Sequence, residues 1–131
     1  MNPNAEFDVV VFGATGFTGQ LVAEYLNKQY GKNGGITWAM AGRSADKLAE
    51  VRDLIGAPAD TPLIVADSSD TASLDAMAQR AKCVLTSVGP YSLYGEPVVK
   101  ACVDAGADYV DLCGEVLFMR EMIEKCLTQY C

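Results

Sequence analysis

The stretch Phe7-Asp8-Val9-Val10-Val11-Phe12, followed by Gly13-Ala14-Thr15-Gly16-Phe17-Thr18-Gly19, decides the fold of this chain. Its first part is a short apolar run with three valines in a row, which predicts a parallel strand buried on both faces. Five apolar residues then recur at helical spacing and predict the buried face of a helix: Phe17, Leu21, Val22, Tyr25 and Leu26. A strand, a glycine-rich turn and a helix form the context in which a dinucleotide-binding motif is meaningful.

Each glycine of this turn has a physical role in such a motif. Gly13 lets the chain leave the strand in a conformation that a Cβ would obstruct. Gly16 leaves room for a pyrophosphate beside the backbone, and Gly19 lets the helix pack closely on the strand. The unpaired N–H groups at the helix start, at the positive end of its dipole, then receive the phosphate.

We therefore predict that the whole turn binds cofactor, including Ala14 and Phe17, with the hydroxyls of Thr15 and Thr18 as further donors. The spacing G-x-x-G-x-x-G is looser than the strict fingerprint and is typical of short-chain-dehydrogenase-like folds. The alternative interpretation is a turn that only connects two elements.

The end of the next predicted strand, residues 36–41, indicates which nicotinamide cofactor is bound. An NAD-binding protein usually carries an acidic residue near this point to hold the ribose 2′-hydroxyl. Arg43 and Ser44 stand here instead, and a guanidinium beside a hydroxyl suits a 2′-phosphate. The sequence therefore favours NADP over NAD. Alternatively, Arg43 is a solvated turn residue and Ser44 only caps the following helix.

Two further strand ends supply candidate binding residues. Residues 63–66 form a predicted third strand closed by Asp67, which either accepts a hydrogen bond from the adenine amine or, like Ser69, caps the next helix. Residues 83–88 form a fourth strand. The strand order of a doubly wound sheet reverses here and leaves a crevice. We expect this crevice to be lined by Val88, Gly89, Pro90 and Tyr91.

Both Tyr91 and Tyr94 are candidates for the wall of the nicotinamide site, with packing under a loop as the alternative for each. Pro97 suits the first turn of the next helix, where Glu96 would meet the positive end of the dipole. Residues 108–113 form a fifth strand whose Asp111 either faces the crevice or caps a neighbour, and a last helix starts near Glu115. Five alternating strand–helix units predict an α/β fold: a doubly wound parallel sheet in a three-layer α/β/α, Rossmann-like NAD(P)-binding domain over residues 1–131.

Composition narrows the class of protein. The chain has 131 residues, half of them hydrophobic, which suits one globular domain. Its net charge of −7, without a basic cluster, argues against nucleic acid and anionic membranes as main partners. The five cysteines are odd in number and form no C-x-x-C pair, and the chain has no histidine, so we expect reduced thiols and no metal site. No signal peptide or membrane span is visible, which predicts a cytoplasmic protein.

Taken together, these motifs resemble the amino-terminal domain of the saccharopine dehydrogenase-like oxidoreductases, a wider group that includes the trans-acting enoyl reductases. Four segments carry the resemblance: residues 9–19, residues 41–44, residues 88–97 and the run Asp111-Leu112-Cys113-Gly114-Glu115. They extend over the chain to about Lys125. The first segment is shared by many folds, whereas the set in this order is specific.

The resemblance implies an NAD(P)-dependent oxidoreductase that transfers hydride to or from a small-molecule or lipid substrate. It also implies a second α/β domain that forms most of the substrate site. Nothing in this chain corresponds to that domain, so we expect a fragment that is inactive alone. Peripheral membrane association of the full-length protein stays open, and an open sheet edge would favour self-association.

Two other functions fit the same turn. One is an NADP-sensing regulator without chemistry, since function must be argued from a site and not from a fold. The other is a short-chain dehydrogenase or epimerase, which needs a Tyr-x-x-x-Lys pair that this chain lacks. The catalytic acid or base is unknown, and we expect that no residue of this chain performs that role.

Overall fold

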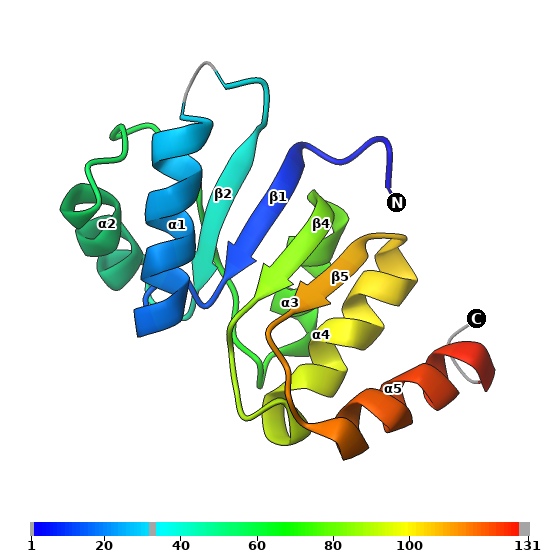
Figure 1. Ribbon diagram of the computed structural model, residues 1–131. Coiled ribbons are helices and arrows are strands. Elements are labelled where there is room, and N and C mark those ends of the chain that lie inside the picture. Colours follow the sequence, from blue (N-terminus) through cyan, green and yellow to red (C-terminus); the bar gives the residue numbers. More distant parts are fainter. Residues whose placement is uncertain (1, 32–33, 129–131) are drawn as a thin grey trace.

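The computed structural model describes residues 2–31 and 34–128. Its elements alternate along the chain in the order β1 (Phe7–Phe12), α1 (Phe17–Gln29), β2 (Trp38–Gly42), α2 (Ala45–Leu54), β3 (Leu63–Val65), α3 (Thr71–Gln79), β4 (Ala81–Thr86), α4 (Tyr91–Ala105), β5 (Asp108–Asp111) and α5 (Val116–Thr128). All five strands are parallel, in the spatial order β3-β2-β1-β4-β5. The predicted doubly wound α/β fold is confirmed (Figure 1).

Helices cover both faces of the sheet. One apolar cluster joins α1 and α2 to the sheet through Val11, Met40 and Leu48. A second joins α3 and α4 to the opposite face through Val10 and Val84. The remaining helix, α5, packs against α4 beside this second layer (Figure 1). Val10 and Val11 are completely buried, as expected for a central parallel strand.

The predicted buried face of α1 is correct only in part, because Leu26 is buried and Val22 packs against the core, but the other three residues are exposed. Phe17, Leu21 and Tyr25 are 83%, 53% and 57% exposed, whereas Gly19, Ala23 and Leu26 face the sheet. The reason is the contact between Gly19 and the glycine turn, which fixes the rotation of the helix about its axis. Residues four and seven positions after Gly19 then fall on the same face.

The predicted start of α4 is also wrong. The helix begins at Tyr91, so Pro97 lies inside it and not in its first turn. Glu96 accordingly lies away from the helix start, and its carboxylate binds Lys125 of α5. Helix α4 ends at its C-cap, Gly106, which adopts a left-handed conformation with φ of 72°.

Among the predicted caps, Ser44 does cap α2, but α3 is capped by Asp70 and not by Asp67 or Ser69. Four of the five cysteines lie in the described part of the chain and are free thiols, while Cys131 lies outside it. None of the helices described is long and apolar enough to cross a membrane. Strands β3 and β5 form the sheet edges, and self-association through an edge stays a prediction.

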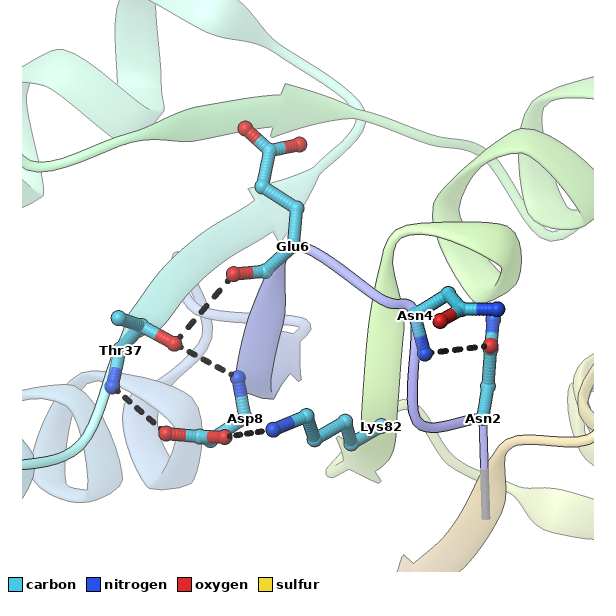
Figure 2. A network of polar contacts seen from close by, with 6 residues as sticks. All are labelled: Asn2, Asn4, Glu6, Asp8, Thr37 and Lys82. Carbon is cyan, nitrogen blue, oxygen red and sulfur yellow. Dashed lines mark hydrogen bonds and ion pairs between the residues drawn. The ribbon is translucent and has the colours of Figure 1, made fainter.

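A polar network holds the amino ends of the three central strands together. The Asp8 carboxylate accepts a hydrogen bond from the Thr37 backbone N–H at 3.0 Å and pairs with the Lys82 ammonium at 2.9 Å (Figure 2). The Thr37 hydroxyl accepts from the Asp8 N–H and donates to the Glu6 carbonyl. The Thr37 N–H, followed by Lys82, lowers the pKa of Asp8 below its ordinary value.

Replacing Asp8 with Asn should lower the free energy of unfolding at pH 7 by about 1 kcal/mol, because a charge-assisted hydrogen bond and an ion pair are lost. Since the pKa of Asp8 is depressed in the folded state, this stabilisation is present above its unfolded value and disappears as the pH falls through the folded value. Denaturant unfolding of both proteins between pH 7 and pH 3 measures the difference. A gap that widens toward low pH would contradict the assignment. Glu24→Gln, which breaks only an exposed pair on α1, is the control.

Candidate nucleotide-binding cleft

A cleft of about 520 Å³ lies where the strand order reverses, between the carboxyl ends of β1 and β4. Its volume falls in the range of small-molecule and cofactor sites. The two strand ends are tied together, because the Ser87 N–H donates to the Phe12 carbonyl at 3.1 Å. In open α/β sheets this crevice is the usual position of a ligand.

The structure brings most of the sequence-predicted residues to this cleft. Those that line it are Gly13, Thr15, Gly16, Phe17, Thr18, Arg43, Asp67, Val88 and Gly89. The lining also includes residues that the motifs did not single out, namely Phe12, Gly42, Ser68, Ser69 and Ser87. Ser68 and Ser69 follow β3, and Ser87 follows β4, so their positions at strand ends were the signal available in the sequence.

Five residues that the sequence predicted for the cofactor site do not line the cleft. Ala14 is fully buried, and Gly19 packs against the turn. The Ser44 hydroxyl accepts the Lys47 N–H at the start of α2. Pro90 precedes the first residue of α4. Tyr91 is buried: its hydroxyl donates to the Thr86 carbonyl and accepts from the Leu112 N–H, both at 3.2 Å.

The three glycines of the turn differ in how strictly the fold requires them. Gly13 has a φ of 88°, which disfavours any residue with a Cβ. A Cβ on Gly19 would lie 1.9 Å from the Gly13 carbonyl oxygen, so no side chain fits there. Gly16 has an ordinary φ of −76°, and an added Cβ would meet the Gly13 oxygen only at 3.5 Å. The fold itself therefore does not need a glycine at position 16, but a Cβ would project into the space beside the turn.

The start of α1 differs from the starts of the next three helices. Side chains cap α2 and α3 through Ser44 and Asp70, and the Glu115 carboxylate accepts the first two N–H groups of α4. Helix α1 begins after Gly16 with no side-chain cap and no acidic residue in its first turn. Its positive end is thus open beside the cleft, as an anion site requires.

Charged groups lie at the side of the cleft formed by β2 and β3. Arg43 is exposed there and lies within electrostatic reach of Asp67. One Asp67 oxygen accepts both the N–H and the hydroxyl of Ser69 at 2.9 Å. These bonds, together with Arg43, lower the pKa of Asp67, so its carboxylate is ionised at neutral pH. Of the two alternatives for Asp67, capping of α3 is excluded, because Asp70 performs it.

On the other side, Asp111 is hydrogen-bonded within its own segment and is not free in the crevice. Its carboxylate accepts the Tyr109 hydroxyl at 2.6 Å and the Cys113 N–H at 2.9 Å. Burial, followed by the bond to Asp111, raises the pKa of Tyr109, so this phenol stays protonated. Tyr94 is 43% exposed and lines the cleft.

Comparison with known proteins identifies the family. Residues 9–130 match the family described as the saccharopine dehydrogenase NADP binding domain. The chain belongs to this family. Its cofactor is accordingly NADP, as Arg43 predicted, and the open start of α1 and the space at Gly16 fit this group.

Curated relatives include trans-acting enoyl reductases of Mycobacterium tuberculosis and Mycobacterium leprae. They are 52% identical over 120 residues and 51% identical over 126 residues, which is 91% and 95% of this chain. The chain spans only 28% and 29% of the length of these relatives.

Solved structures with the same fold include the apo saccharopine dehydrogenase (L-Glu forming) of Saccharomyces cerevisiae. Its TM-score is 0.71 at 23% identity, over 88% of this chain and 24% of that one. A nucleoside-diphosphate-sugar epimerase from Pseudomonas aeruginosa aligns with a TM-score of 0.62 at 20% identity, over 82% of this chain and 33% of that one.

Substitution by alanine should have different effects at Gly16 and at Gly19, on NADPH affinity at the first and on stability at the second. Gly19→Ala forces backbone atoms apart and should lower the free energy of unfolding by about 3 kcal/mol. Gly16→Ala should leave stability within about 1 kcal/mol of the original and yet weaken NADPH binding, because the methyl group fills the space beside the open helix start. Thermal unfolding and NADPH titration measure the two effects. Unchanged NADPH affinity in the folded Gly16→Ala protein would contradict this assignment.

Proposed function

We propose that this chain is the nucleotide-binding part of an NADPH-dependent reductase that acts on an enoyl group. One observation carries the proposal: the amino end of α1 has no side-chain cap. It lies next to Gly16, a position where the fold itself would accept a Cβ. The names of the mycobacterial relatives support the enoyl substrate. Residues that bind this substrate would come from outside the chain.

The proposed placement of the cofactor follows from the cleft. The N–H groups at the start of α1 bind the pyrophosphate, with Thr15 and Thr18 beside them. Arg43 binds the 2′-phosphate of the adenosine, which carries a charge that a carboxylate would repel. The adenosine therefore lies on the β2–β3 side, and the nicotinamide lies near Val88, Gly89 and Tyr94.

Bound NADPH supplies a hydride, and the protein contributes its position. Reduction of an enoyl group by hydride also requires a proton, and we propose that the group that donates this proton lies outside this chain. Tyr91 is poorly suited to this role, because its hydroxyl is held by two backbone groups and burial raises its pKa. The isolated chain should therefore bind NADPH without turnover.

Arg43→Ala should weaken NADPH binding by about 10- to 100-fold, because charge-assisted bonds to the phosphate are lost. NADH affinity, measured in the same titration calorimetry, should change by less than about twofold. The control is Arg120→Ala, which removes a cation of the same kind from an exposed position on α5. Equal losses of affinity for NADPH and NADH would contradict the assignment of Arg43 to the 2′-phosphate.

The enoyl reductase activity is tested by a chimera. This chain replaces the matching 120 residues of the Mycobacterium tuberculosis trans-acting enoyl reductase. The chimera should oxidise NADPH in the presence of the enoyl substrate of that enzyme, and Arg43→Ala in the chimera should raise the KM for NADPH. A folded chimera that binds NADPH but does not reduce the substrate would favour the NADP-sensing alternative.

A further inference from the structure

The segment after β5 is tied to the first turn of α4 by two side chains. The Glu115 carboxylate accepts the N–H of Tyr91 at 2.6 Å with one oxygen and the N–H of Ser92 at 3.1 Å with the other. In return, the Tyr91 hydroxyl accepts the Leu112 N–H and donates to the Thr86 carbonyl at the end of β4. Glu115 and Tyr91 thus form a reciprocal clasp between the β4–α4 and β5–α5 connections, which Figure 1 shows side by side below the sheet.

We propose that Glu115 is a positioning residue for the nicotinamide half of the cofactor. This inference rests on the function proposed above. Residues 87–89 line the cleft and lead directly into α4, so the clasp fixes the end of the segment that the nicotinamide would contact. Glu115 itself does not line the cleft and acts through the backbone of Tyr91 and Ser92.

The clasp is built to hold at neutral pH. The N–H groups of Tyr91 and Ser92 lower the pKa of Glu115, which keeps the carboxylate ionised and able to accept both bonds. Other contacts hold the partners of these bonds in place, because the Glu115 backbone N–H donates to the Cys113 sulfur and the ring of Phe118 stacks on that of Tyr91. A glutamine at this position would present an amide NH₂ to one of the two N–H donors and lose that bond.

The decisive test compares two ligands that differ only in the nicotinamide. Glu115→Gln should weaken binding of NADPH by about tenfold, since one charge-assisted bond and the fixed geometry are lost. Binding of 2′-phospho-ADP-ribose, which lacks the nicotinamide, should change by less than about twofold. Titration calorimetry with the chain as it stands measures both affinities, and Glu124→Gln, in an exposed pair on α5, is the matched control.

If Glu115→Gln does not fold, a second variant still tests the inference. Tyr91→Phe retains the ring and Glu115 but removes the two hydroxyl bonds, and it should show the same selective loss for NADPH. Equal losses for both ligands would mean that the clasp only holds the fold, and unchanged affinities would mean that it does not position the cofactor. Either result overturns the inference while the proposed function stands. Failure of the unsubstituted chain to bind either ligand would overturn the proposed function itself.

Discussion

The backbone contact between Gly19 and Gly13 is the constraint on which the rest of the structure depends. With no room for even one Cβ, the start of α1 rests directly on the turn that follows β1. This contact sets the rotation of the helix, so Ala23 and Leu26 become its buried face and Phe17 stays exposed beside the cleft. It also points the positive end of the helix dipole at the place where the connections after β1 and β4 leave the sheet toward opposite faces.

The two ends of the sheet have different polar organisation. At the amino ends, Asp8 is fully engaged by Thr37 and Lys82, so the charges there stabilise the pairing of three strands (Figure 2). At the carboxyl ends, a side chain accepts one N–H of the first turn in α2 and in α3 and two N–H groups in α4, whereas α1 has no side-chain cap. An unsatisfied helix start is tolerated where water or a ligand reaches it. The start of α1 can therefore offer its N–H groups to a ligand in the cleft.

What the sequence predicted correctly was local. The strand–turn–helix unit, the glycine spacing and the Ser44 cap, which was the alternative to a role in cofactor binding, each depend on a few neighbouring residues. The errors arose where tertiary contacts decide. The exposed face of α1 follows from close packing at Gly19, and the early start of α4 follows from Glu115, a residue 24 positions away from Tyr91 in the sequence. No periodicity or propensity reports such a contact.

The two sides of the cleft also differ in whether local or distant contacts determine their geometry. The side proposed for the pyrophosphate is made of backbone: a turn and a helix start whose geometry is set within one strand–helix unit. The side proposed for the nicotinamide ends in a segment held by side chains, namely the carboxylate of Glu115 and the hydroxyl of Tyr91. A backbone site has little freedom to change without unfolding the turn. A side-chain clasp can be altered by one substitution, so under this proposal the nicotinamide side is where the fold can adjust the position of the cofactor to its substrate.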